Sequence, residues 1–402
     1  MKIKEPTALT ASTSATLSKS TTLILAIACG LSVANVYYNQ PLLADMGREF
    51  QVSVQQIGLI PTLTQVGYAV GLLLLVPLGD CVERHRLILT VLGFLVSALI
   101  AAAISPNVVW LTGSSIILGF TSIVAHLIIP MVAQMTAPSE RGKVIGTLIS
   151  GLILSLLLAR SVSGTVGHLW GWRVMYWIGA GLMIAVAMVL YKRLPSNPPA
   201  SKLRYRELMQ SLVGLVREQP ILRAAALNNA LLFASFNAFW ATLVFFLETP
   251  PYHYDSRAAG LFGLIGIVGA IASPIVGRLA DRYGARLLIK VAINTTLAAF
   301  LILWTNGTHL FGLIVGVVLL DLGIHIAYLS NQVRVYNLVP NAESRLNTVY
   351  MVTNYTGGAL GSLLGTYSWS IWQWNGICAL GSFLLTAAAI LHFGPLLKLK
   401  IG

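Results

Sequence analysis

Charged residues are scarce in this sequence. Asp, Glu, Lys and Arg make up 10% of the 402 residues, whereas 56% are hydrophobic. Soluble globular proteins carry about 25% charged residues, so this chain lacks the polarity to cover a surface that faces water. Long apolar runs recur instead, each close to the roughly 20 residues that an α-helix needs to cross a bilayer. The composition predicts an all-α polytopic membrane protein, because a transmembrane barrel would show alternating segments of about ten residues.

Cysteine is rare as well, and the motifs of several enzyme classes are missing. Cys29, Cys81 and Cys378 are scattered, which favours neither a disulfide framework nor a metal cluster. The chain has no G-x-x-x-x-G-K-S/T loop for a nucleotide. It also has no nucleophile–base pair or metal constellation typical of an intramembrane enzyme. We therefore expect no metal, no cofactor and no enzymatic activity.

The apolar runs predict twelve membrane-spanning helices. The first run lacks the small-residue cleavage site that follows a signal peptide, so we interpret it as a retained helix. The predicted spans are residues 21–44, 54–78, 87–104, 108–134, 143–167, 173–192, 222–248, 257–278, 287–304, 309–334, 346–368 and 374–395.

The net charge of +13 is explained by membrane topology. With both termini in the cytoplasm, the inner tails and loops hold all of the 26 Lys and Arg residues except Arg48, Arg160, Arg173 and Arg257. That distribution follows the positive-inside rule. We expect the protein to lie in the lipid bilayer of the plasma membrane, as the inner membrane of a bacterium. We expect no nucleic-acid partner.

Two segments half a chain apart resemble each other. "PLGDCVERHRLIL" follows the second predicted span and "GRLADRYGARLLI" follows the eighth, with Asp80 and Asp281 at matching positions. A Pro-rich and then basic, amphipathic stretch separates the two halves. Such a repeat is typical of transporters whose substrate path lies between two bundles. We predict a disordered cytoplasmic tail (1–20), a six-helix bundle (21–192), a cytoplasmic linker with an amphipathic helix (193–221), a second six-helix bundle (222–395) and a cytoplasmic tail (396–402).

The loop after the eighth span resembles the G-x-x-x-D-R-x-G-R motif of the major facilitator superfamily (MFS). The matching residues are Gly277, Asp281, Arg282, Gly284 and Arg286, and Asp80 and Arg84 form a degraded first copy. "YYNQPLL", "LLARSVSG", "GWRVMYW", "SNQVRVYNL" and "SRLNTVYM" are similar to a bacterial subgroup named as sugar or drug efflux permeases. The resemblance implies the MFS fold, with two pseudo-symmetric six-helix bundles, and export coupled to protons.

The charges of these loops are candidates for a conformational latch. Ion pairs at the inner mouths of the helices can hold the two halves in one conformation, and a few kcal/mol suffice to bias such an equilibrium. The alternative is a set of solvated loop charges. The latch candidates are Asp80, Arg84, Gly277, Asp281, Arg282 and Arg286.

A polar stripe runs along the tenth span. Asp321, His325, Tyr328 and Gln332 follow helical spacing on one face of an otherwise apolar segment. A charge near the bilayer centre costs about 2.5–3.5 kcal/mol, so the stripe should face a cavity or another helix. Burial favours a protonated carboxyl and a nearby cation favours the ionised form, so Asp321 is the candidate proton carrier and His325 a candidate relay. The alternatives are a fixed ion pair or a hydrogen-bond network for Asp321, and an interhelical hydrogen bond for His325.

Arg160 is the second deep charge, in the fifth span. Its surroundings, "SGLILSLLLARSVSG", resemble the G-x-x-x-G-P-x-x-G-G motif of proton antiporters, with arginine in place of proline. Arg160 could bind an anionic group of the substrate or act as the counter-ion of Asp321. The alternative is an arginine that is satisfied by backbone carbonyls or that extends to the membrane surface.

Four further residues are candidates for the cavity. His126 in the fourth span is a rough counterpart of His325, although an interhelical hydrogen bond would also explain it. Asn35 lies deep in the first span, while Asn237 and Trp240 belong to an aromatic wall of the seventh. That wall suits sugars or aromatic amphiphilic compounds, and a packing role is the alternative.

Taken together, these features predict a secondary transporter that works by alternating access. We expect a monomer that exports a small organic solute, sugar-like or drug-like, using the proton gradient as its energy source. A proton symporter or a uniporter for uptake is the alternative within transport. A non-transporting membrane receptor or sensor is the alternative from another class.

Overall fold

The computed structural model describes residues 18–194, 204–336, 338–339 and 342–393. The side chains of Pro138, Gly269, Ala270, Ser273, Pro274, Gly277, Ala280 and Asp281 are not among the described ones. The predicted tail 396–402, nearly all of the tail 1–20 and part of the linker therefore lie outside the described residues.

The protein is all-α, as predicted, since every regular element of the described residues is a helix. Ten of these helices are long and apolar enough to cross a membrane. One of them, α16 (Glu343–Phe393), reverses direction at Gln373 (φ 53°, ψ −139°) and so contributes two antiparallel limbs. A further rod is broken into short helices over Ser256–Tyr283. The architecture agrees with twelve crossings.

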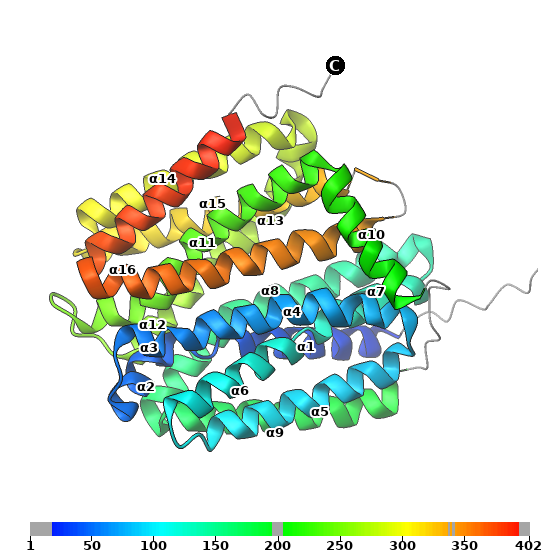
Figure 1. Cartoon of the computed structure of the whole chain (residues 1–402), viewed down its shortest axis with the longest axis horizontal. Coiled ribbons are helices and arrows are strands. Elements are labelled where there is room, and N and C mark those ends of the chain that lie inside the picture. Colours follow the sequence, from blue (N-terminus) through cyan, green and yellow to red (C-terminus); the bar gives the residue numbers. More distant parts are fainter. Residues whose placement is uncertain (1–17, 195–203, 337, 340–341, 394–402) are drawn as a thin grey trace, which may run out of the picture.

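The two halves form two layers in Figure 1, joined by the linker helix α10 (Tyr205–Glu218). The N-terminal half consists of α1 (Lys19–Ala34), η1 (Asn35–Tyr37), η2 (Gln40–Leu42), α2 (Leu43–Phe50), α3 (Val54–Ile57), α4 (Leu59–Cys81), α5 (Arg84–Ala103), α6 (Val108–Thr121), α7 (Val124–Met135), α8 (Pro138–Trp170) and α9 (Trp172–Arg193). The C-terminal half consists of α11 (Pro220–Glu248), α12 (Ser256–Phe262), η3 (Gly263–Gly266), α13 (Ile267–Tyr283), α14 (Ala285–Asn306), α15 (Leu310–Tyr336) and α16.

Several helices are interrupted near the middle of the bundle. The first span changes from α-helix to 3₁₀-helix at Asn35 and again at Gln40, next to Pro41, which has no N–H to donate. The eighth span contains the 3₁₀ turn η3, which begins and ends with glycine. A 3₁₀-helix advances about 120° per residue instead of about 100°. These interruptions therefore change which side chains face the interface between the halves.

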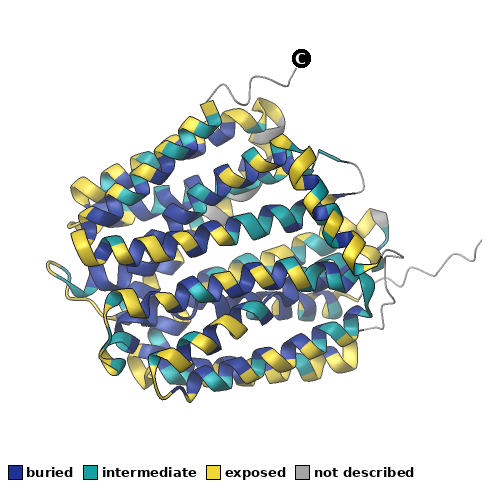
Figure 2. Ribbon diagram, in the orientation of Figure 1, coloured by how far each residue is buried: buried dark blue, intermediate teal, exposed yellow. Residues whose placement is uncertain are grey.

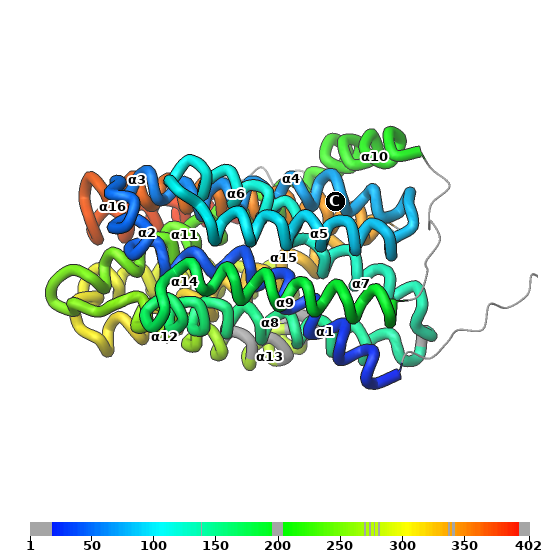
Figure 3. Tube along the Cα trace, turned by 90° about the horizontal axis from the view of Figure 1, so that it is seen from below, coloured from blue at the N-terminus to red at the C-terminus, as the bar shows by residue number. Residues whose placement is uncertain are grey.

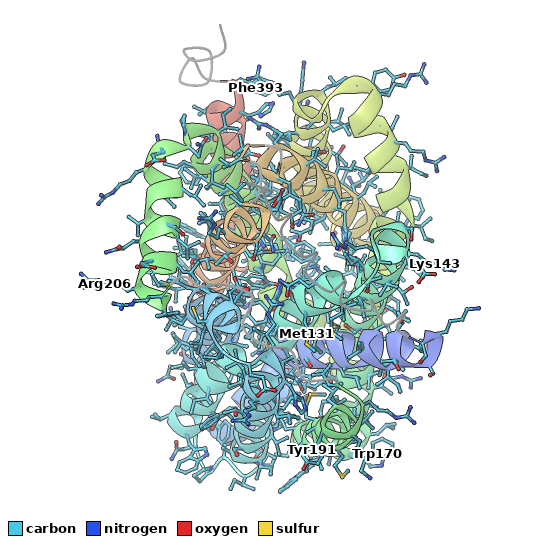
Figure 4. The ribbon with its side chains drawn as sticks, turned by 90° about the vertical axis from the view of Figure 1, so that its right-hand side faces the viewer. Met131, Lys143, Trp170, Tyr191, Arg206 and Phe393 are labelled. Carbon is cyan, nitrogen blue, oxygen red and sulfur yellow. The ribbon has the colours of Figure 1, made fainter. Side chains whose placement is uncertain are left out.

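We call the end of the bundle that carries Lys19, α10 and Phe393 the tail end, and the opposite end the far end. Burial increases toward the interior of the bundle, and the outward faces of the helices are exposed (Figure 2). Many exposed side chains on these faces are large and apolar, as expected for contact with lipid. The linker helix α10 lies across the outside of the tail end (Figure 3). In the view from the tail end, Arg206 of α10 and Lys143 of α8 point outward from opposite sides (Figure 4).

Candidate transport site

Arg160 of α8 lies between the two halves, and its side chain is held by aromatic rings. The residue is 6% exposed. Its Nε donates a hydrogen bond of 2.7 Å to Oε1 of Gln40 in η2. The guanidinium carbon lies 4.2 Å from the ring centroid of Trp240 in α11 and 5.0 Å from that of Tyr37 in η1. These distances fit cation–π contacts, so rings from both halves enclose one buried cation.

Asp321 of α15 is the second buried charge of the centre. It is 2% exposed, and its Oδ2 has no hydrogen-bond partner among the described residues. Arg160 is close enough to attract it electrostatically. The two side chains form no ion pair within 4.0 Å in the described part of the chain. Asp321 and Arg160 are therefore neighbours without a direct bond.

The 3₁₀ turn η3 lies against both charges. A Cβ atom added to Gly263 would come within 2.8 Å of Cβ of Arg160. A Cβ atom added to Gly266 would come within 3.5 Å of Oδ1 of Asp321. Residues i and i+3 eclipse each other in a 3₁₀-helix. One glycine-lined face of η3 therefore contacts the arginine at one end and the aspartate at the other.

The remaining residues of the Asp321 stripe point to other partners. Nδ1 of His325 shares a hydrogen bond of 2.9 Å with the backbone oxygen of Asp321, one turn earlier. Nε2 of Gln332 donates to the hydroxyl groups of Tyr328 at 3.3 Å and Tyr336 at 3.0 Å. The stripe is thus divided into a buried acid and a hydrogen-bonded network nearer to the tail end.

Polar contacts connect the halves beside this centre. Nε2 of Gln65 in α4 donates to Oδ1 of Asn237 in α11 at 2.8 Å. The rings of Tyr68 in α4 and Tyr355 in α16 lie 4.4 Å apart. Nε2 of His126 lies 3.0 Å from the hydroxyl of Tyr68. Asn237 therefore bonds across the interface, and His126 contacts a tyrosine that packs across it.

Asn35 is not brought together with the other candidates. Its Nδ2 donates to the backbone oxygens of Leu31 and Ser32 in its own helix. A Cβ atom added to Gly179 of α9 would come within 3.3 Å of Oδ1 of Asn35. Asn35 thus faces the interior of the N-terminal half.

Sequence analysis missed Tyr37 and Gln40, which contact Arg160 directly. The 3₁₀ segments alter the rotation per residue and bring them to the interface. Pro41 is the one sequence signal that could have indicated this change.

The latch candidates of the first repeat form a contact inside one half. Arg84 is buried and pairs with Asp80, and its guanidinium also donates to the backbone oxygen of Gly79 and to Oε1 of Gln134 in α7. These contacts fasten the turn between α4 and α5 to α7, within the N-terminal half.

In the second repeat, Arg282 and Arg286 are exposed. The guanidinium of Arg282 lies 5.1 Å from the ring centroid of Tyr283. The side chains of Gly277 and Asp281 are not described, so the latch remains a prediction. Among the described residues, no group of three or more His, Cys, Asp or Glu side chains is placed to hold a metal ion.

Comparison with known proteins now identifies the family. The sequence profile of the Major Facilitator Superfamily matches residues 25–366 and 263–398. The chain belongs to the Major Facilitator Superfamily. It is 37% identical over 366 residues to the uncharacterized transporter YgaY of Escherichia coli O157:H7, which covers 91% of this chain and 93% of that protein. It is 24% identical over 330 residues to a probable sugar efflux transporter of Helicobacter acinonychis, with 81% and 82% covered.

Solved structures agree on the MFS fold. A bacterial homologue of the human lysosomal transporter Spinster, in an inward-facing and unoccupied conformation, superimposes with a TM-score of 0.73 at 15% identity. The match covers 94% of this chain and 97% of that chain. The predicted fold class and family are confirmed, and this MFS protein is a membrane transporter.

Proposed function

We propose that this MFS transporter exports a small organic solute in exchange for protons, with Asp321 as the proton carrier. The observation that carries the proposal is the buried carboxyl oxygen of Asp321 that has no partner among the described residues. An ionised carboxylate in such a place is unfavourable unless it is paired and hydrogen-bonded. In this conformation the carboxyl group therefore favours a bound proton.

Release of that proton requires a different environment around Asp321. Alternating access supplies one, because movement of the halves exposes the centre to water or to a bound solute. Asp321 belongs to the C-terminal half and the nearby Arg160 to the N-terminal half. Their electrostatic interaction therefore changes whenever the halves move relative to each other.

Two observations support the orientation and the direction of transport. The Lys and Arg residues that precede and follow the spans cluster toward the loops and tails of the tail end, which the positive-inside rule assigns to the cytoplasm. The name of the Helicobacter acinonychis relative favours efflux over uptake. The far end then faces the outside.

The test is proton movement in proteoliposomes that contain the purified transporter. A panel of sugars, amino acids and amphiphilic compounds is added on one side, and a pH-sensitive dye is read on the other. We expect Asp321→Asn to lose solute-driven proton flux, and its residual exchange of labelled solute for unlabelled solute should be independent of pH. Glu218→Gln, the same chemical change on exposed α10, should behave as wild type. Full proton coupling in Asp321→Asn would refute the proposal, and solute flux in the direction of proton flux would identify a symporter.

A further inference from the structure

Three buried polar groups between the halves are not fully paired in the described part of the chain. Nε is the only nitrogen of the Arg160 guanidinium that has an acceptor there, although the group carries five N–H donors. The indole Nε1 of Trp240 and Oδ2 of Asp321 have no partner. All three residues are more than nine-tenths buried. Because unsatisfied buried polar groups are costly, this set of atoms is complementary to something that the chain itself does not provide.

The unsatisfied groups carry both signs of charge. Arg160, with Trp240 beside it, offers donors at one end of the glycine-lined face of η3, and Asp321 offers an acceptor at the other end. A ligand with only a positive charge would leave the guanidinium as an uncompensated buried charge. A ligand with only a negative charge would compensate Arg160 while Asp321 kept its proton, so its binding would not displace the proton that exchange requires.

We propose that the transported solute is a compact zwitterion, whose anionic group binds Arg160 and whose ammonium group binds Asp321. This inference rests on the proposed function, because it assigns a substrate class to the same site. A carboxylate accepts two parallel hydrogen bonds from a guanidinium, and the indole N–H of Trp240 is a further donor beside it. The ammonium replaces the proton of Asp321 as the partner of the carboxylate.

The charge balance gives the sign of proton coupling. The charged and titratable groups beside Asp321 are Arg160 and His325. Before the solute binds, Asp321 holds a proton, and Arg160 is the only charge of the pair that it forms with Asp321. When a zwitterion binds, its ammonium pairs with ionised Asp321, and the displaced proton leaves to water. No covalent bond forms or breaks. The proton and the solute thus compete for one carboxylate, which is the requirement for exchange rather than for cotransport.

The walls of the centre restrict the rest of the solute. The rings of Tyr37, Phe236 and Trp240 surround the guanidinium. Leu243 and Val244 line a small cavity beside Arg160 and Trp240. Apolar and aromatic surfaces stabilise apolar groups by burial. The solute class is therefore amino-acid-like with an apolar or aromatic side group.

The experiment compares zwitterions with analogues that lack one charge. The probes are phenylalanine and leucine, the cations phenethylamine and isoamylamine, the anions 3-phenylpropionate and 4-methylpentanoate, and neutral glucose. Binding is measured as thermal stabilisation of the full-length transporter, and transport as counterflow in proteoliposomes. We expect at least one amino acid to bind at least about tenfold more tightly than both of its single-charge analogues.

Two variants test the assignment of each charge. Arg160→Gln should no longer bind the amino acid more tightly than the corresponding amine. Asp321→Asn should no longer bind the amino acid more tightly than the corresponding anionic analogue. Arg160→Lys keeps the positive charge, so it should keep the preference for the amino acid over the amine. Proper assembly is checked by size-exclusion chromatography of every variant.

The outcomes separate this inference from the proposed function. If glucose or a single-charge analogue binds more tightly than both amino acids, the zwitterion inference is wrong, and it is equally wrong if neither amino acid binds. If glucose or a single-charge analogue drives proton flux that depends on Asp321, the proposed export function still holds. Loss of every solute-driven proton movement would refute the proposed function as well.

Discussion

The two ends of the interface between the halves are held by different kinds of contact. At the far end, side chains of one half bond directly to the other half. At the tail end, the linker helix bridges them. The far-end bonds are Arg48 Nη1 to Glu248 Oε1 (2.5 Å), Gln55 Nε2 to Ser370 Oγ (2.6 Å), Ser161 Oγ to the backbone oxygen of Gly260 (2.9 Å) and His168 Nδ1 to Asp255 Oδ2 (3.0 Å).

The tail end depends on one amphipathic helix. The Tyr205 hydroxyl of α10 donates to the backbone oxygen of Leu74 in α4 at 3.1 Å. Burial raises the pKa of this hydroxyl above its ordinary value, so it remains a donor at neutral pH. Leu208 and Leu212 of α10 line a small cavity together with Asp80 of α4 and Arg345 of α16. The linker thus contacts both halves.

The different contacts predict that the two ends open in different ways. Opening the far end breaks several short polar contacts at once. Among the described residues at the tail end, α10 contacts both halves, and Asp80 of α4 and Arg345 of α16 line one cavity with it. The structure therefore corresponds to a state that is closed at the far end. Each prediction below weakens one of these two kinds of contact.

The largest effect is expected at a close approach of α8 and α12. A Cβ atom added to Gly260 would lie 2.5 Å from the backbone oxygen of Arg160. Gly260→Leu should therefore prevent closure of the far end, and overpacking of this kind costs about 1–3 kcal/mol. Solute counterflow should fall by about tenfold or more.

A matched control lies on α8, the helix that Gly260 of α12 contacts. A Cβ atom on Gly146, in the tail-end part of α8, would have no atom within 4 Å among the described residues. Gly146→Leu should transport at close to the wild-type rate. Equal loss of counterflow in both variants would show that an added side chain in itself, rather than obstruction of the far end, causes the defect.

A smaller effect is expected for the ion pair between Arg48 and Glu248. Exposed ion pairs contribute up to about 1 kcal/mol, so Arg48→Gln should increase the open population of the far end up to about fivefold. The measurement is the labelling rate of Thr366→Cys, which lies beside Gly58 of the other half. The three native cysteines are replaced by alanine for this experiment.

Charge reversal provides the control for that pair. Arg48→Glu should label faster than wild type, and the double variant Arg48→Glu, Glu248→Arg should return toward the wild-type rate. Because Asp45 also pairs with Arg48, the recovery should be partial. Labelling that is unaffected by all three variants would show that the pair does not hold the far end closed.

The smallest effect is expected at the tail end. Tyr205→Phe removes one hydrogen bond of about 0.5–1.5 kcal/mol and leaves the ring in place. Labelling of Thr366→Cys should decrease slightly or stay constant, because loosening the tail end does not open the far end. Faster labelling in Tyr205→Phe would contradict the separation of the two ends.

Sequence reasoning located the buried charges because such residues are rare in apolar runs. Asp321 and Arg160 were therefore conspicuous, and Trp240 followed from an aromatic cluster at helical spacing. Gln65 was missed, although it bonds to Asn237 of the other half, because one polar amide in a span has no distinctive pattern. Contacts between halves join positions such as these, 172 residues apart, and periodicity within one helix carries no information about them.

The helix count was predictable from hydropathy, whereas the local geometry of the site was not. The position of Tyr37 depends on 3₁₀ turns, which differ from an α-helix by about 20° of rotation per residue. The proximity of Arg160 to Asp321 depends on η3, whose glycines permit α8 and α15 to approach it closely. Such features follow from tertiary packing.

Proton release on solute binding tests the central claim most directly. The detergent-solubilised transporter is mixed in weak buffer with a saturating solute from the panel, and protons are counted with a pH-sensitive dye. We predict release of up to about one proton per transporter in wild type and in Glu218→Gln, and none in Asp321→Asn. Undiminished release in Asp321→Asn, or proton uptake by the wild type when the solute binds, would contradict exchange at Asp321.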